Sequence, residues 1–276
     1  MIVLTVSVLL VAVVARTQLP VLGAGGLLHP ARRHSSVAPP VGCRPVTFTG
    51  EGVNLVGWHC RTDVRRRGTL IYLHGIADNR SSGAGVITRF LETGFDVIAY
   101  DSRAHGESGG DACTYGFFEK DDLRRVIDDV GGGAIVVLGT SLGAAVALQQ
   151  AGRDSRITAI VAAESFSDLR RVATERAPFF FTAGIIEQAF RLAEQQARFR
   201  VDAVSPVDAA AAITAPVLVI HGAADAETPP DHARRLFAAL AGPKRLVLVP
   251  GAGHNESLRG AVWIEIEEWL DAIVPR

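Results

Sequence analysis

The sequence predicts an α/β protein, in which a mostly parallel β-sheet is covered by helices on both faces. Short apolar runs typical of buried strands alternate with segments of helical length, and this alternation is typical of parallel sheets. Polar residues follow several of the apolar runs directly, at the sheet edge where such folds bind ligands. The length of 276 residues suits one domain of this kind with a small insertion.

The sheet is expected to begin with a hairpin, because apolar and polar residues alternate over 46–49 and 53–60 around Gly50-Glu51-Gly52. Further strands are expected where short runs are continuously apolar. These runs are 69–73, 95–100, 134–138, 157–162, 216–220 and 245–249.

Helices are expected between the strands, where apolar residues recur with helical spacing or where small residues dominate. The helix over 117–130 carries acidic residues toward its start, the end at which the helix dipole favours negative charge. The other expected helices cover 81–93, the Ala-rich segment up to residue 151, 230–241 and 257–273.

The alternation stops between residues 165 and 205, which contain no strand pattern. The segment 183–200 has helical spacing, so we expect a small helical cap inserted over the site. Three consecutive phenylalanines, Phe179 to Phe181, precede that helix. We expect them to pack the cap onto the body, with an acyl pocket as the alternative interpretation.

The N-terminal region is expected to be separate from the globular domain. Residues 1–34 form an apolar segment, residues 35–45 form a linker with two serines and three prolines, and the domain covers 46–276. Residues 1–15 carry no charge, although they are short for a spanning helix of about 20 residues. A membrane anchor is favoured, and a signal peptide cleaved after Ala15 or Ala24 is the alternative. We therefore expect a membrane-anchored or exported protein.

Composition and cysteine spacing argue against several classes of function. A net charge of −1 and 7% aromatic residues leave no electrostatic footprint for nucleic acid. Cys43, Cys60 and Cys113 lack the spacing of a zinc site. We favour three free thiols, with a Cys43–Cys60 disulfide in an oxidising compartment as the alternative.

The most informative motif is Gly139-Thr140-Ser141-Leu142-Gly143, a G-x-S-x-G sequence between an expected strand and an expected helix. A turn this tight strains the backbone at the serine and leaves no room for side chains at the two glycines. The serine hydroxyl is then presented at the carboxyl edge of the sheet, beside the positive end of the helix dipole. We therefore expect Ser141 to be a nucleophile.

A nucleophilic serine needs a base, and that base needs an acid to orient it and to stabilise its positive charge. Asp225 follows the strand 216–220 and His254 follows the strand 245–249. The order Ser141, Asp225, His254 is the order of the triad that accompanies a G-x-S-x-G turn. Glu164 and Glu227 also follow strands, and they rank second and third as the acid.

The oxyanion hole is expected to use two backbone N–H groups, one from Leu142 and one from Ile76 in the loop after 69–73. His74 is expected to brace that loop. In the long loop after 95–100, three polar side chains are expected to hold the backbone together without a catalytic role. These are Asp101, Arg103 and Ser108.

Together these residues resemble the α/β-hydrolase superfamily, and most closely its serine aminopeptidase-like branch, which includes membrane-anchored proteins of the Bem46 type. The resemblance covers residues 46–276 and implies an eight-stranded sheet with a cap after the sixth strand. It also implies that Ser141, Asp225 and His254 are nucleophile, acid and base, with Ile76 and Leu142 at the oxyanion positions. The matching elements are LHGIADNR (73–80), YDSRAHGESGG (100–110), GTSLGAA (139–145), AAESFSDLR (162–170), HGAADAETP (221–229) and PGAGHNE (250–256).

The expected function is a serine hydrolase that cleaves a carboxylic ester or thioester of a small-molecule or lipid-like acyl substrate. Its chemistry needs no metal and no organic cofactor. Two alternatives stay open. One is an amide or peptide hydrolase that uses Glu164 to anchor a free amino terminus, and the other is a non-catalytic scaffold linked to a membrane. The sequence carries no signal for an oligomeric state.

Overall fold

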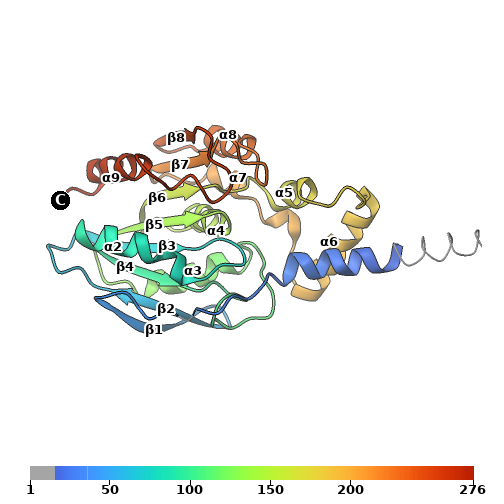
Figure 1. Ribbon diagram of the computed structural model, residues 1–276, viewed down its shortest axis with the longest axis horizontal. Coiled ribbons are helices and arrows are strands. Elements are labelled where there is room, and N and C mark those ends of the chain that lie inside the picture. Colours follow the sequence, from blue (N-terminus) through green and yellow to red (C-terminus); the bar gives the residue numbers. More distant parts are fainter. Residues whose placement is uncertain (1–15, 36) are drawn as a thin grey trace, which may run out of the picture.

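In a computed structural model, which describes residues 16–35 and 37–276, the chain folds around an eight-stranded sheet (Figure 1). The strand order is β1-β2-β4-β3-β5-β6-β7-β8. Strand β2 is antiparallel to β1 and β4, and every pair from β4 to β8 is parallel. The predicted fold class is confirmed. The strands are β1 Cys43–Thr49, β2 Asn54–Cys60, β3 Gly68–Leu73, β4 Phe95–Tyr100, β5 Ala134–Thr140, β6 Ile157–Ala163, β7 Val217–Gly222 and β8 Lys244–Val249.

Helices cover both faces of the sheet because alternate residues of each central strand point to opposite sides. In β3, Ile71 and Leu73 pack on the side of α3, α4 and α8, whereas Leu70 and Tyr72 pack on the side of α2 and α9. The helices are α2 Ala84–Glu92, α3 Glu119–Asp128, α4 Leu142–Ala151, α5 Leu169–Glu175, α6 Ala183–Ala197, α7 Pro206–Ala210, α8 Asp231–Ala239 and α9 Val262–Ile273, with 3-10 turns η1 Arg80–Gly83 and η2 Val201–Ala203.

Several element boundaries differ from the predicted ones. Strand β1 begins at Cys43, within the expected linker, because its residues pair with β2 as far as Cys60. The helix expected over 81–93 begins as the 3-10 turn η1, which the Asn79 side chain caps by accepting from the Ser81 N–H at 2.9 Å. The last helix begins at Val262 rather than at Ser257.

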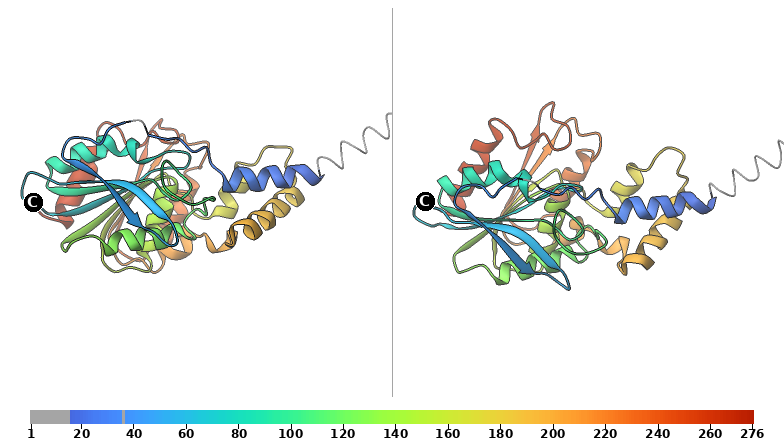
Figure 2. Two further views of the ribbon diagram at one scale, coloured as in Figure 1. Left: turned by 90° about the horizontal axis from the view of Figure 1, so that it is seen from below. Right: turned by 60° about the horizontal axis from the view of Figure 1, so that its bottom comes forward.

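The cap consists of α5 and α6, inserted after the sixth strand as predicted. The described part of the chain begins with a helix over residues 16–28, here called the N-terminal helix. Its buried residues Ala24 and Leu28 pack in one apolar cluster with Phe190 and Ala193 of α6. Figures 1 and 2 show this helix, drawn in blue, beside α6 at the end of the molecule opposite the C-terminus. The N-terminal helix is therefore attached to the cap.

No helix within the described residues is both long and apolar enough to cross a bilayer. Residues 1–15, on which the expected anchor or signal peptide mainly rests, lie outside the described residues, as does the cleavage site at Ala15. The alternative cleavage site, ending at Ala24, lies inside the N-terminal helix.

The expectation that Phe179 to Phe181 pack the cap onto the body is wrong for two of the three residues. Phe179 is 100% exposed and Phe180 is 51% exposed, because the loop between α5 and α6 lies at the outer end of the cap (Figure 1). Phe181 is partly buried and lines an apolar cavity beside the N-terminal helix.

The preference for three free thiols is also wrong. Cys43 and Cys60 form a disulfide, because the register of the β1–β2 hairpin places them directly opposite each other. Cys113 is a free, buried thiol.

The loop after β3 is braced by His74, as predicted. Its Nε2 accepts from the Ser102 N–H at 2.9 Å and its Nδ1 donates to the Gly75 carbonyl at 2.7 Å. The buried ring of His105 packs edge-on against it, with ring centroids 5.2 Å apart. Burial first, and the charge that His105 would carry second, lower the pKa of His74 from 6.5 to about 4. Burial also lowers the pKa of His105.

The long loop after β4 is held by the three polar side chains expected there. The Asp101 carboxylate accepts from the backbone N–H groups of Arg80 and Glu107, at 2.7 and 2.9 Å. Ser108 donates to the Asp101 carbonyl at 2.6 Å, and Arg103 forms a two-pronged ion pair with Asp122 of α3. These contacts attach the loop to η1 and α3.

A buried neutral histidine makes stability sensitive to acid, because the unfolded chain binds its proton at a higher pH. The contribution of His74 to the free energy of unfolding is complete above pH 6.5. It is lost as the pH falls from 6.5 toward 4, by about 3 kcal/mol in total. We expect the free energy of unfolding, measured by urea denaturation at several pH values, to fall over this window. In His74→Gln, which cannot titrate, the fall should be smaller by that amount. Equal slopes in the two proteins would contradict the assignment.

Candidate functional site

Ser141 lies at the apex of a sharp turn between β5 and α4, with φ 49° and ψ −110°. This region of backbone space costs a residue with a side chain about 1–3 kcal/mol, and it is found where a site requires it. The two glycines of the motif permit the turn sterically. A Cβ on Gly139 would overlap the backbone of Gly143, and a Cβ on Gly143 would overlap the carbonyl of Leu73. As expected, neither Gly139 nor Gly143 has space for a side chain.

The structure brings Ser141, His254 and Asp225 into one hydrogen-bonded chain. His254 Nε2 lies 3.0 Å from Ser141 Oγ, and His254 Nδ1 lies 2.7 Å from an Asp225 carboxylate oxygen. Since an ionised carboxylate only accepts, Nδ1 carries the proton and Nε2 is the acceptor for the serine hydroxyl. The three residues come from the ends of β5, β7 and β8, as the order of the motifs predicts.

Asp225 is held as an anion. One carboxylate oxygen accepts from the backbone N–H groups of Glu227 and Thr228, at 2.9 and 2.8 Å, and the other lies 3.3 Å from His221 Nε2. Burial by itself would raise the pKa of Asp225. The hydrogen bonds from His221, His254 and Thr228 outweigh burial and hold this pKa well below its usual range. The carboxylate can therefore stabilise a positive charge on His254.

Neither competing acid contacts His254. Glu164, which ranks second, accepts from three consecutive backbone N–H groups, those of Asn255, Glu256 and Ser257, at 2.7, 3.1 and 2.9 Å. Its carboxylate thereby holds the loop that carries His254. Glu227 is exposed, and its backbone N–H rather than its side chain contacts Asp225.

The predicted oxyanion residues lie on both sides of the serine. Leu142 is the first residue of α4, and Ile76 lines the same cleft as Ser141 and His254. The backbone before Ile76 approaches the serine closely, since a Cβ on Gly75 would lie 3.6 Å from Ser141 Cβ. Within residues 16–35 and 37–276, neither the Ile76 nor the Leu142 N–H has an acceptor. Both donors are available to an oxygen bound beside Ser141.

Ser141 and His254 border a cleft of about 530 Å³. Two arginines that sequence reasoning missed also line it, Arg33 from the segment after the N-terminal helix and Arg176 from the end of α5. His221, buried beside Asp225, was missed as well. Its spacing of four residues from Asp225 was the available signal, whereas nothing local in the sequence places Arg33 near Ser141.

Known proteins resemble this chain in sequence and in fold. Residues 70–265 match the model of the "Alpha/beta hydrolase family". By sequence, the chain is 32% identical to YqkD of Bacillus subtilis over 219 residues, which cover 74% of this chain and 71% of YqkD. It is 31% identical to Rv2307c of Mycobacterium tuberculosis over 245 residues, which cover 86% and 81% of the two chains.

Two groups of solved structures share the fold. The esterase Pf2001 of Pyrococcus furiosus has a TM-score of 0.68 and 24% identity, covering 89% of this chain and 96% of the esterase. The acylaminoacyl peptidase of Pyrococcus horikoshii has a TM-score of 0.67 and 15% identity, covering 85% of this chain and 42% of the peptidase. Because the family match covers most of the sheet and the G-x-S-x-G turn, the chain belongs to the alpha/beta hydrolase family.

Proposed function

We propose that the protein is a serine hydrolase that cleaves a carboxylic ester or thioester through an acyl-enzyme intermediate. The observation that carries this proposal is the continuous hydrogen-bonded chain from Ser141 Oγ through His254 to Asp225. A histidine base in this position, oriented by an ionised carboxylate, increases the nucleophilicity of a hydroxyl that is otherwise inert near neutral pH.

In the proposed reaction, His254 Nε2 takes the hydroxyl proton as Ser141 Oγ attacks the carbonyl carbon. The Ile76 and Leu142 N–H groups bind the developing oxyanion, and removing one such donor costs about 10²–10³ in rate in a related site. His254 then protonates the leaving alcohol or thiol, which leaves an acyl group on Ser141. A water molecule, deprotonated by His254, attacks that acyl group and regenerates the serine. Asp225 stays ionised and stabilises the imidazolium throughout.

Contacts of Glu164 favour an ester over a peptide as the substrate. An aminopeptidase needs a carboxylate that is free to bind the ammonium group of the substrate. Both oxygens of Glu164 already accept backbone hydrogen bonds from the His254 loop, so they are engaged in holding that loop. The intact Ser141–His254 contact likewise argues against a non-catalytic scaffold.

We also propose that the protein is associated with a membrane through its N-terminus, in keeping with the Bem46-type branch that its motifs resemble. Two features support this proposal. Residues 1–15 carry no charged side chain and are almost entirely apolar. The loop between α5 and α6 exposes Phe179 and Phe180, and the N-terminal helix exposes Leu22. Aromatic and aliphatic side chains exposed together are typical of surfaces that enter a lipid interface.

Ser141→Ala should abolish labelling of the full chain by a fluorescent fluorophosphonate and lower kcat for p-nitrophenyl butyrate by about 10⁴-fold or more. Labelling, followed by gel fluorescence, reports the activated serine independently of substrate preference. Ser155→Ala, at an exposed serine outside the cleft, serves as the control and should label like the wild type. A folded wild-type protein that resists labelling would refute the proposed mechanism.

Glu164→Gln should lower kcat for the same ester by about 10–100-fold with little change in KM, because a misplaced His254 affects the transition state more than substrate binding. The substitution keeps the shape of the side chain but removes the charge that three N–H groups share. The exposed Glu268→Gln, matched in chemistry, should behave like the wild type. An unchanged kcat in Glu164→Gln would show that the His254 loop holds its position without this carboxylate.

Removal of residues 1–15 should release the protein from phosphatidylcholine vesicles, because this apolar segment is expected to insert into the lipid. Flotation of the full chain and of the shortened chain on a density gradient measures this. In the full chain, Phe179→Ser combined with Phe180→Ser should weaken vesicle binding relative to the wild type. A full chain that stays at the bottom of the gradient would argue against membrane association.

A further inference from the structure

A second cavity, of about 350 Å³, lies between the N-terminal helix, α5 and α6. We call it the cap chamber. Its lining is apolar except for Tyr115 and Arg176. The Tyr115 hydroxyl donates to the Leu27 carbonyl at 3.0 Å, so this polar atom is already satisfied. The volume lies within the range of small-molecule sites, and its lining suits hydrocarbon rather than a polar group.

The cap chamber adjoins the catalytic cleft at Arg176, which lines both. The Arg176 guanidinium donates to the Glu227 carbonyl at 2.8 Å and to Thr228 Oγ1, in the loop that carries Asp225. Arginine commonly presents its aliphatic stem to apolar surface while its head binds polar groups. A hydrocarbon chain that enters the chamber along the aliphatic stem of Arg176 would therefore begin beside the loops that carry the candidate catalytic residues.

Two glycines of the N-terminal helix, Gly23 and Gly26, line the chamber. A Cβ on Gly23 would lie 2.9 Å from Phe181 and 3.0 Å from the Ala189 side chain, so even a methyl group would crowd that wall. A Cβ on Gly26 would meet no atom within 4 Å. Gly26 lines the chamber and is itself exposed, so the chamber opens to solvent on this side and an apolar chain can enter it there.

The wall formed by the N-terminal helix is fastened to the catalytic domain by the segment that follows it. Arg32 donates to the Ser108 and Gly110 carbonyls at 2.9 and 2.7 Å, and the Cys113 N–H donates to the Leu28 carbonyl at 2.9 Å.

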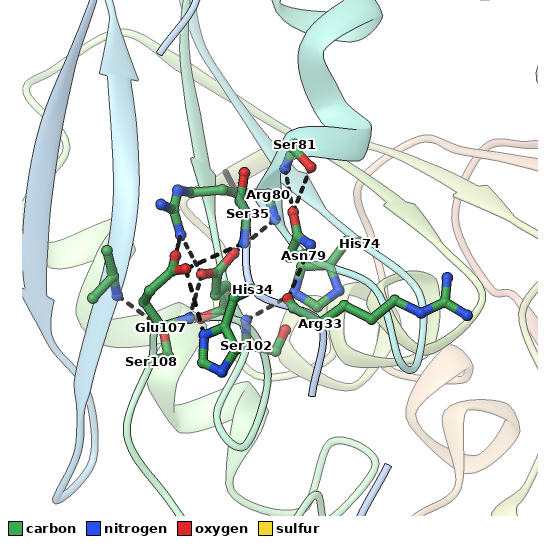
Figure 3. Close-up of polar contacts among 12 residues, drawn as sticks. Arg33, His34, Ser35, His74, Asn79, Arg80, Ser81, Ser102, Glu107 and Ser108 are labelled. Atoms are coloured by element: carbon green, nitrogen blue, oxygen red, sulfur yellow. Dashed lines mark hydrogen bonds and ion pairs between the residues drawn. The ribbon is translucent and has the colours of Figure 1, made fainter. Parts of the chain in front are cut away.

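Further along the same segment, Asn79 donates to the Arg33 carbonyl at 3.1 Å and the Ser35 N–H donates to Glu107 at 3.2 Å (Figure 3). Asn79 belongs to the same loop as Ile76, one of the candidate oxyanion donors. The N-terminal helix is thus held in place from both the catalytic loops and the cap.

We propose that the cap chamber binds a hydrocarbon chain of the ester substrate while the ester carbonyl lies at Ser141. The N-terminal helix is then part of the substrate site, and the substrates are esters of long, unbranched chains. This inference rests on the proposed serine hydrolase activity. Each methylene that moves from water into the chamber should raise kcat/KM about fourfold until the chamber is full.

The test uses the full chain and two series of esters. One series lengthens the acyl chain of p-nitrophenyl esters from two to ten carbons, and the other lengthens the alcohol of acetate esters, followed by acetate release. The series whose kcat/KM rises with length identifies the half of the ester that occupies the chamber. A flat profile in both series would overturn the proposal.

Gly26→Leu adds a large side chain to the lining at the exposed side of the chamber, and Ala173→Leu narrows the chamber from the α5 wall. Both should lower kcat/KM at least tenfold for the ten-carbon ester of the responding series and leave the two-carbon ester unchanged. Gly25→Leu is the matched control, because its Cβ is equally unobstructed but lies outside the lining. This control should retain the chain-length profile of the wild type.

Equal losses for short and long esters in both filling variants would contradict the proposal. Failure of the underlying activity is distinguishable from failure of the chamber assignment. If the protein were not a serine hydrolase, neither the two-carbon ester nor the fluorophosphonate would react. If only the chamber assignment were wrong, both would react normally and chain length would have no effect.

Discussion

The contact on which the candidate site depends most is the close approach of the first turn of α4 to the end of β3. It is possible only because Gly143 has no side chain to meet the Leu73 carbonyl and Gly139 has none to meet Gly143. This contact forces Ser141 into its positive-φ conformation and directs its hydroxyl away from the sheet. It also brings the loop after β3 against the serine, so one steric constraint positions the candidate nucleophile and both candidate oxyanion donors together.

The remaining polar residues of the site are positioned by carboxylates with distinct tasks. Asp225 uses one oxygen to bind its own loop and the other to orient His254. Glu164, at the end of the neighbouring strand, uses both oxygens to hold the backbone that carries His254. The two acids follow adjacent strands and have different roles: Asp225 stabilises the imidazole of His254, and Glu164 stabilises the loop that carries it. The difference lies in which donors each carboxylate meets, because the two residue types are chemically equivalent.

The N-terminal helix and the segment that follows it contact both the cap and the candidate site. The N-terminal helix packs on α6, and the segment after it crosses the loops near Ser141 and contributes Arg33 to the cleft (Figures 1 and 3). In Figure 3 the Arg33 side chain extends away from the Glu107 cluster that holds its neighbours His34 and Ser35. A segment that looks dispensable in the sequence is therefore a wall of one cavity and a border of another.

The sequence by itself determined the strand order along the chain, the place of the cap, the tight turn at Ser141 and the choice of Asp225 and His254. These features depend on local patterns, since a buried strand, a glycine-flanked turn and a polar residue after a strand are each encoded by a few consecutive residues. It ranked Asp225 above Glu164 by position, and in the structure Asp225 is the one that hydrogen-bonds to His254. It did not reveal that Glu164 holds the His254 loop.

Tertiary structure alone decided the features that join distant segments. The hairpin register decided that Cys43 meets Cys60, and the packing of the cap decided that Phe179 and Phe180 are exposed while Phe181 lines the chamber. It also decided that Arg33 lies near Ser141, more than a hundred residues away along the chain. Such contacts depend on how whole elements pack against one another, and the periodicity of a single element carries no information about its partner.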